Sequence, residues 1–132
     1  NLIGYKFAIW GLSFKPETDD MREAPSIYVV KELLSRGAKI SAYDPKATFE
    51  AKTQYLKDYK LKYCQSKYEA VENTDAIIIL TEWKEFRSPD FNKLKSRVKQ
   101  SIIFDGRNIY KDFDIELKNW EHHQIGKATE LN

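Results

Sequence analysis

The sequence has little cysteine and histidine, the residues on which disulfide frameworks and most zinc sites depend. Its 132 residues include one cysteine, Cys64, and two histidines, the neighbours His122 and His123. A single cysteine excludes an internal disulfide and is compatible with a reducing cytosol. Adjacent histidines on a strand would face opposite sides of a sheet, so a shared metal ion is not expected. We therefore predict no metal site.

The sequence also lacks a long apolar run and a large excess of charge of either sign. No apolar stretch approaches the ~20 residues of a membrane-spanning helix, and the opening NLIGYK does not have the shape of a signal peptide. Lysine and arginine total 22 against 20 aspartates and glutamates. We therefore expect no nucleic-acid partner and no membrane partner.

The chain does not begin with methionine and soon enters a strand-like run. We expect it to be a piece of a longer polypeptide. Its length suits one hydrophobic core, and no repeat, low-complexity tract or linker interrupts it. Residues 1–132 are therefore predicted to form a single domain.

Short apolar runs alternate with helical patterns along the chain. Strands are predicted at residues 6–12, 39–43, 76–80 and 101–104, with weaker candidates at 61–64 and 123–126. Helices are predicted at residues 25–36, 47–59, 67–72, 91–98 and 113–120, the first with Pro25 in its first turn and Gly37 as its C-terminal cap. Such alternation implies an open, mostly parallel sheet of about five to six strands in a three-layer α/β/α arrangement.

In an open parallel sheet, ligands bind outside the carboxyl ends of the strands. Three segments of unusual composition follow predicted strands: residues 11–26, 81–83 and 105–108. We expect these segments to be neighbours if the strands that contain Ile77 and Ile102 flank the first strand.

The first of these segments lacks the glycines of a dinucleotide-binding turn. Gly11 is followed by no second glycine before Gly37, so the usual Gly-x-Gly-x-x-Gly pattern is absent. Lys15 and Arg22 offer cations for a phosphate near the N-terminus of the following helix. Four carboxylates accompany these two cations between residues 11 and 23. A solvated loop whose charges pair with one another is therefore the alternative interpretation.

Four motifs in order carry a resemblance to a known family. They are GLSFKPETDDMREAPS at residues 11–26, AYDP at 42–45, TEW at 81–83 followed by Phe86, and DGRN at 105–108. The tail IGK at residues 125–127 adds to them. Together they resemble the C-terminal, UDP-binding domain of the nucleotide-sugar 6-dehydrogenases, the family of UDP-glucose and GDP-mannose dehydrogenases. The TEW motif favours the UDP-glucose branch.

The resemblance implies a Rossmann-like domain from a cytoplasmic, NAD-dependent UDP-glucose 6-dehydrogenase of polysaccharide biosynthesis. Enzymes of this family oxidise the C6 alcohol of a nucleotide sugar to a carboxylate in two hydride transfers to NAD⁺, through a thiohemiacetal and a thioester on a catalytic cysteine. An N-terminal domain holds most of the NAD⁺, a central helix builds a homodimer, and the C-terminal domain closes over the UDP. The partners implied are thus a UDP-sugar and the N-terminal and central domains of the same polypeptide. The chain alone is expected to be inactive.

The resemblance also assigns roles to four side chains. Phe14 and Lys15 match a pair that contacts the nucleotide sugar, with the lysine at the phosphates, and Arg107 matches an arginine that contacts the UDP-sugar. Arg22 matches an arginine that reaches NAD⁺ across the interdomain cleft. A guanidinium suits phosphate because it offers several donors in one plane. Cys64 lies outside every motif and is expected to be a structural thiol, so no catalytic residue is assigned in this chain.

Other polar and aromatic side chains allow two interpretations. Asp19 and Asp20 form an acid–base pair or order the loop through Arg22 or backbone amides, and the second interpretation is favoured. Trp83 stacks on a base or packs in the core or an interface. The tyrosines at 55, 59, 63 and 68 are expected to cover hydrophobic surface.

Two functional alternatives stay open. The longer polypeptide could act on GDP-mannose or on a UDP-N-acetylhexosamine, because selectivity depends partly on residues outside this chain. The chain could instead be a non-enzymatic receiver-like signalling module. That module needs acidic residues directly after the first strand and an acceptor aspartate after the third. Residues 11–13 (GLS) and 64–66 (CQS) do not supply them.

Overall fold

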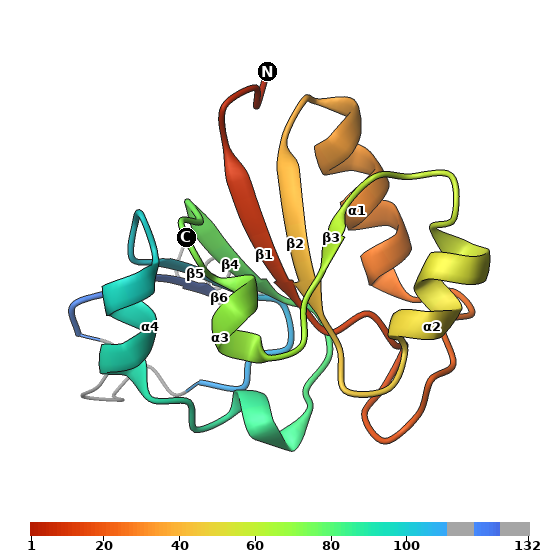
Figure 1. The fold of residues 1–132 in the computed structure, drawn as a ribbon. Helices are drawn as coiled ribbons and strands as arrows, with labels where there is room; N and C mark the ends of the chain where they lie inside the picture. The colour runs from red at the N-terminus through yellow and green to blue at the C-terminus, as the bar shows by residue number, and fades with distance from the viewer. Residues whose placement is uncertain (111–117, 125–132) are drawn as a thin grey trace.

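The computed structural model describes residues 1–110 and 118–124, which are built around a six-stranded sheet (Figure 1). Every strand pairs in parallel with its neighbours, in the order β3-β2-β1-β4-β5-β6. The strands are β1 (Lys6–Trp10), β2 (Lys39–Tyr43), β3 (Lys62–Tyr63), β4 (Ala76–Ile79), β5 (Ile102–Asp105) and β6 (Glu121–Gln124). The prediction of an open parallel α/β sheet is confirmed.

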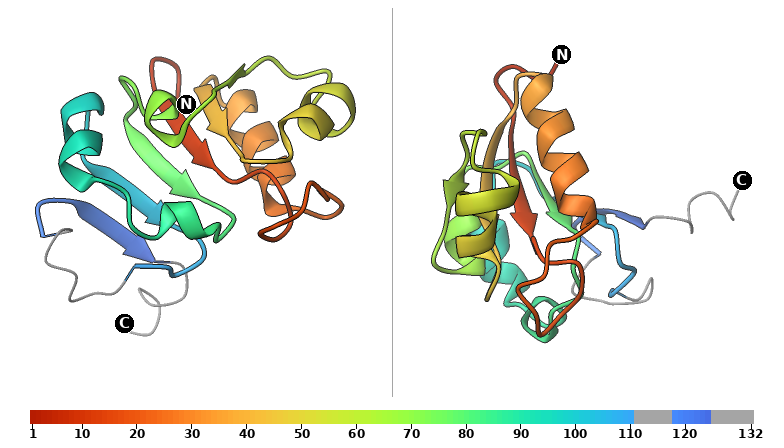
Figure 2. Two further views of the ribbon diagram at one scale, coloured as in Figure 1. Left: turned by 60° about the horizontal axis from the view of Figure 1, so that its bottom comes forward. Right: turned by 90° about the vertical axis from the view of Figure 1, so that its right-hand side faces the viewer.

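Helices lie on both faces of this sheet (Figure 2). They are α1 (Pro25–Ser35), α2 (Thr48–Glu50), α3 (Lys67–Ala70) and α4 (Phe91–Arg97), with a π-helical turn η1 (Ala51–Tyr55) and a 3₁₀ turn η2 (Lys84–Phe86). Helix α1 and turn η1 share one hydrophobic cluster with β1 and β2, while α3, η2 and α4 belong to the other cluster. Within the described residues, no helix has the length and apolar character that crossing a membrane requires.

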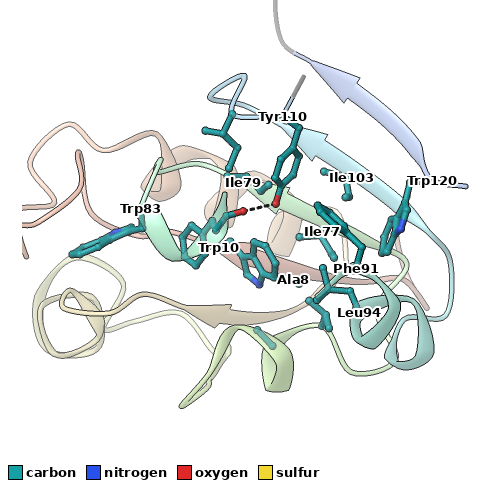
Figure 3. Packing of buried hydrophobic residues seen from close by; sticks show 14 of the residues in the cluster. Ala8, Trp10, Ile77, Ile79, Trp83, Phe91, Leu94, Ile103, Tyr110 and Trp120 are labelled. Carbon is teal, nitrogen blue, oxygen red and sulfur yellow. Dashed lines mark hydrogen bonds between the residues drawn. The ribbon is translucent and has the colours of Figure 1, made fainter. Parts of the chain in front are cut away.

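Strand β1 lies inside the sheet, between β2 and β4, and the side chains of its last three residues alternate between these two clusters. Ile9 belongs to the cluster of α1, whereas Ala8 and Trp10 belong to the cluster of α3 and α4. The Trp10 ring stacks on Phe86 of η2 at 5.0 Å between centroids. Figure 3 shows this second cluster, in which the Tyr110 hydroxyl donates a hydrogen bond to the Phe86 carbonyl. The segment after β5 is therefore fastened to the core.

Helix α1 begins and ends as the sequence predicts. Pro25 occupies its first turn, and Gly37 just after it has φ of +95°, the left-handed conformation of a helix C-cap. The Ser26 hydroxyl is buried and donates to the Leu12 carbonyl at 2.6 Å. The start of the helix is thereby tied to the loop that follows β1.

Two expectations about the elements are wrong in part. The helical segment predicted at residues 47–59 is present as α2 and η1, which follow each other directly, but it ends at Tyr55 and not at Tyr59, because threonines and tyrosines there weaken an ordinary α-helix. The strands at Ile77 and Ile102 do not both flank β1, since β4 lies between β1 and β5.

Two further predictions fall wholly or partly on the 111–117 and 125–132 segments. The helix predicted at 113–120 lies mostly outside the described residues, and so does the IGK tail at 125–127. The weak strand predicted at 123–126 corresponds to the edge strand β6, which the structure places at Glu121–Gln124.

Candidate functional site

The carboxyl ends of the parallel strands meet at one edge of the sheet, at the bottom of Figure 1. This edge carries the loop after β1 (residues 11–24), the turn after β2 (residues 44–47), the TEW segment (Thr81–Glu82–Trp83) after β4 and the segment after β5 (residues 106–110). All three segments that were singled out from the sequence therefore lie at the same edge, although β5 is one strand further from β1 than expected.

Asp44, directly after β2, fixes the start of the loop after β1. Its Oδ2 atom accepts hydrogen bonds from the backbone N–H groups of Leu12 and Ser13, at 2.7 and 2.9 Å. Its Oδ1 atom accepts from Lys46 and Ala47 N–H, at 2.8 and 2.7 Å. A carboxylate that is 4% exposed and accepts four amides holds both loops in one geometry.

Close packing also fixes the point where this loop leaves β1. Gly11 has φ of +100°, and a Cβ atom at this position would lie 2.5 Å from the Thr81 side chain. The Thr81 hydroxyl donates to the Ser13 carbonyl at 2.6 Å, and Trp83 Nε1 donates to the Ser13 hydroxyl oxygen at 3.3 Å. Trp83 is 6% exposed, so it packs in the core and is not available to stack on a base.

The next residues of the loop present their side chains to solvent. Phe14 is 47% exposed, and Lys15 is exposed beside it. Arg22 forms an ion pair with Asp20, with Nη2 2.8 Å from Oδ2, and its backbone N–H donates to the same carboxylate. These hydrogen bonds from Arg22 lower the pKa of Asp20 to about 2. For Asp20, the interpretation that it orders the loop through Arg22 and a backbone amide is confirmed.

Arg107, after β5, is held through two carboxylates. Its guanidinium Nη2 lies 3.0 Å from Oε2 of Glu82, and its backbone N–H donates to Asp105 Oδ1 at 3.2 Å. Burial alone would raise the pKa of Glu82, but the hydrogen bond from Arg107, a backbone hydrogen bond and the nearby charges of Arg107 and Arg87 together lower that pKa. The Arg107 side chain keeps 40% of its surface exposed, so the guanidinium is both oriented and accessible.

Asp105, the last residue of β5, organises the segment that carries Arg107. Besides Arg107, it accepts hydrogen bonds from the N–H groups of Ile109 and Tyr110, at 3.1 and 3.0 Å, and His122 Nε2 lies 3.5 Å away. Asp105 is fully buried. Burial would raise its pKa, but the hydrogen bonds, led by that of His122, lower it overall.

Sequence reasoning missed the roles of Asp44 and Asp105. Both residues lie inside the AYDP and DGRN motifs, which by themselves assign no role to either aspartate. One pattern in the sequence could have indicated these roles. In each case an aspartate stands at the carboxyl end of an apolar strand, directly before Pro45 or Gly106. A carboxylate in that place is buried by the sheet and must find donors, which the adjoining loop amides supply.

Cys64 and the two histidines lie in structural positions. Cys64 is 5% exposed, and burial raises the pKa of its thiol, as expected of a structural cysteine. His122 approaches Asp105, whereas His123 stacks on Phe104 at 5.1 Å, so the two rings face different surroundings. Across residues 1–110 and 118–124, no group of three histidine, cysteine, aspartate or glutamate side chains could hold a metal ion.

The four tyrosines predicted to cover hydrophobic surface pack against neighbouring side chains. Tyr55 and Tyr63 lie against the cluster of α1, and Tyr68 lies against that of α4. Tyr59 is 40% exposed, and Lys31 lies over its ring at 5.4 Å.

Comparison with known proteins matches this arrangement to one family. This is the UDP-glucose/GDP-mannose dehydrogenase family, and residues 8–112 match its UDP binding domain. UDP-glucose 6-dehydrogenase from Pseudomonas aeruginosa is 43% identical over 127 residues, which cover 94% of this chain and 28% of that protein. The enzyme of the same name from Rhizobium meliloti is 40% identical over 127 residues, covering 96% of this chain and 28% of that protein. The chain thus spans less than a third of the length of these relatives.

Solved structures share the fold. A dehydrogenase of NDP-N-acetyl-D-galactosaminuronic acid from Methanosarcina mazei superposes with a TM-score of 0.74 at 26% identity, over 95% of this chain and 25% of that one. A UDP-glucose dehydrogenase from Pyrobaculum islandicum gives 0.73 at 25% identity, over 92% of this chain and 25% of that one. These matches favour the dehydrogenase family over the alternative interpretation of the chain as a receiver-like signalling module. The chain, with its fixed loops at the carboxyl edge of a parallel sheet, belongs to the UDP binding domain of the UDP-glucose/GDP-mannose dehydrogenase family.

Proposed function

We propose that the chain is the C-terminal domain of an NAD-dependent UDP-glucose 6-dehydrogenase, in which it binds the UDP part of the substrate. One observation carries the proposal. Phe14, Lys15 and Arg107 all present exposed side chains at the carboxyl edge, on backbones that Asp44 and Asp105 hold in place. Such an edge is where open parallel sheets bind ligands.

The chemistry of these side chains suits a nucleoside diphosphate. Lys15 supplies a compact positive charge, and Arg107 supplies several donors in one plane for phosphate oxygens. Phe14, beside Lys15, offers an aromatic surface to the nucleotide sugar. Because Arg107 is oriented by Glu82 before any ligand arrives, less side-chain entropy is lost on binding.

Arg22 is the proposed contact of this domain to NAD⁺. Most contacts to NAD⁺ are proposed to come from other domains of the longer polypeptide. Its side chain is 79% exposed, so it can reach a group outside this domain. When bound in the complete enzyme, NAD⁺ accepts the hydride from the substrate. The loop that carries Arg22 has no second glycine to let the backbone approach a pyrophosphate. Arg22 therefore orients a cofactor that it does not hold alone.

The complete enzyme is proposed to be a cytoplasmic homodimer that makes UDP-glucuronate for polysaccharide biosynthesis. In this proposal residues 1–132 are one domain, and its partners are the N-terminal and central domains of the same polypeptide. The relatives' greater length supports further domains, and the single thiol Cys64 is compatible with a reducing cytosol. The catalytic cysteine is assigned to those other domains.

Titration of the 132-residue chain with UDP, followed by the backbone amide signals in NMR, tests the proposal. We expect shifts at Phe14, Lys15 and Arg107, and no NADH from UDP-glucose and NAD⁺. Affinity is expected to be weak, since the other wall of the cleft is missing. Shifts confined to a distant surface, or no shifts at millimolar UDP, would contradict UDP binding.

A second candidate is a parent enzyme for GDP-mannose or a UDP-N-acetylhexosamine. One of the solved structures that match, from Pyrococcus horikoshii, is described as a UDP-D-ManNAc dehydrogenase and is 27% identical, with a TM-score of 0.70. Turnover of each nucleotide sugar by the complete enzyme separates these substrates. UDP-glucose is expected to be turned over fastest, and faster oxidation of another sugar would reassign the parent.

A further inference from the structure

The TEW segment stands between the two loops that carry the proposed UDP contacts. It follows β4, and β4 pairs with β1 on one side and with β5 on the other. The loop with Phe14 and Lys15 leaves β1, and the segment with Arg107 leaves β5. The TEW segment is thus the part of the edge that adjoins both.

Thr81 and Trp83 bind the loop on the β1 side. Both side chains reach Ser13, the residue before Phe14: the Thr81 hydroxyl donates to its carbonyl at 2.6 Å, and Trp83 Nε1 donates to its hydroxyl oxygen at 3.3 Å. The Ser13 hydroxyl in turn donates to the Lys15 carbonyl at 3.0 Å. A chain of two hydrogen bonds therefore runs from the Trp83 side chain to the backbone of Lys15.

The three side chains that make this connection are shielded from water. Thr81, Ser13 and Trp83 are 0%, 1% and 6% exposed. Figure 3 shows Trp83 at one end of the buried cluster, with Trp120 far from it at the other end. Hydrogen bonds in such surroundings are costly to break, because each freed group would stay buried without a partner.

Glu82, between these two residues, binds the other loop. Its Oε2 atom pairs with Arg107 Nη2 at 3.0 Å, and its side chain is 27% exposed. Thr81 and Trp83 thus bind Ser13, and the residue between them binds Arg107. Three consecutive residues connect the two loops that carry the proposed UDP contacts.

We propose that the TEW segment is a positioning element that sets the spacing of Lys15 against Arg107 and so determines the affinity for the nucleotide's diphosphate. Thr81 and Trp83 are positioning residues that act through Ser13, and Glu82 acts through Arg107. The inference rests on the proposed function. Two cations on separate loops bind one diphosphate well only when their spacing is fixed beforehand, because ordering them on binding reduces the affinity.

Thr81→Val in the 132-residue chain tests this role, since it removes the hydroxyl and keeps the shape. We expect UDP affinity, measured by calorimetry, to fall about fivefold, the effect of one buried hydrogen bond. Thr81→Ser restores the donor and is expected to recover most of the affinity. Trp83→Phe removes the indole N–H donor and keeps an aromatic side chain. We expect this independent variant to lower UDP affinity as well.

Thr74→Val is the matched control. The Thr74 hydroxyl is equally buried and donates to the Val71 carbonyl at 2.8 Å, but it precedes β4 at the opposite edge of the sheet. A variant that is merely destabilised should behave like this control. We expect Thr74→Val to lower the melting temperature about as much as Thr81→Val and to leave UDP affinity unchanged.

Hydrogen exchange of the Phe14 amide in the ligand-free chain gives a readout that does not depend on UDP. This N–H donates to the Asp20 carbonyl at 2.7 Å, inside the loop after β1 that also contains Ser13. Thr81→Val should speed its exchange, and Thr74→Val should not. If both variants have the same UDP affinity and the same Phe14 exchange, the positioning role is wrong. If the unsubstituted chain fails to bind UDP, the proposed function fails, and Phe14 exchange alone decides whether Thr81 holds the loop.

Discussion

Asp44 and Asp105 show how single carboxylates prepare the proposed site. Each stands at the carboxyl end of a strand and accepts backbone N–H groups of a loop, and together they hold the loops of Lys15 and Arg107. Asp44 is 4% exposed and Asp105 is 0% exposed, so neither carboxylate can contact a ligand at the surface. In the proposed site, the residues that contact UDP therefore depend on two carboxylates that do not contact it.

Replacing Asp105 with asparagine should destabilise the chain in a pH-dependent way. The lowered pKa of Asp105 means that its ionised form stabilises the fold above the unfolded value of about 3.9, and that this contribution is lost as the pH falls through the lower folded value. We expect Asp105→Asn to cost about 2 kcal/mol near neutral pH and less in acid. Urea unfolding at about pH 6 and about pH 3 measures this difference. Asp58→Asn, at an exposed position, is the control, and an equal loss at both pH values would contradict the assignment.

Arg107→Lys should not preserve UDP binding, although it keeps the positive charge. A lysine ammonium cannot pair with Glu82 and also offer further donors in the same plane. We expect affinity for UDP to fall about tenfold, close to the effect of Arg107→Ala. Calorimetry on the two variants decides the point, and near-normal affinity for Arg107→Lys would show that charge alone matters.

At the scale of elements, continuous apolar runs predicted the strands well, because a strand buried on both faces has little choice of composition. The run at 76–80 became β4 and that at 39–43 became β2. The helix predicted at 47–59 ends early, at Tyr55, because threonines and tyrosines weaken it, and its π-helical turn could not be foreseen from the sequence. The position of β5 beyond β4 was also missed, since strand order depends on contacts between distant segments.

The same limit applies to the site. The loop after β1 and the TEW segment could be named from the sequence, but the hydrogen bond from Thr81 to Ser13 joins residues 68 positions apart. Local composition carries no signal for such a contact. The charges around Arg22, in contrast, are close in sequence, and the pairing of Asp20 with Arg22 was predicted correctly.

Gly11→Ala should damage the connection between β1 and its loop. The new Cβ would meet the Thr81 side chain at 2.5 Å on a residue with φ of +100°. Gly4→Ala is the matched control, since Gly4 has φ of +92° but nothing within 4 Å of the added carbon. We expect Gly4→Ala to cost about 1–2 kcal/mol from backbone conformation alone, and Gly11→Ala about 2 kcal/mol more. Chemical denaturation of both variants measures the difference, and equal costs would show that Thr81 yields easily.

At the scale of the whole molecule, the proposal makes this chain one wall of a site, and it assigns no nucleophile to the chain. Phe14, Lys15, Arg22 and Arg107 are all available to a ligand at the carboxyl edge, whereas the lone thiol is buried between other elements. In this proposal the domain recognises and orients the UDP-sugar, and the chemistry requires the rest of the polypeptide. The fraction of its relatives that it spans, 28%, agrees with this division.

Cys64 should therefore react slowly with thiol reagents in the native chain. It is 5% exposed, and burial raises the pKa of its thiol, so little thiolate is present near neutral pH. We expect labelling to be roughly a hundredfold slower than in urea-unfolded chain. Mass spectrometry over time measures the rate, and labelling as fast as in the unfolded chain would contradict the structural role.

The central claim is that the carboxyl edge binds UDP through Lys15 and Arg107. Calorimetric titration of UDP into the unsubstituted chain and into Lys15→Ala tests it most directly, with Lys39→Ala as the control. Lys39 is an exposed lysine at the start of β2, on the opposite edge of the sheet. We predict that Lys15→Ala weakens UDP binding about tenfold and that Lys39→Ala leaves it unchanged. Equal affinity in all three chains would contradict the account.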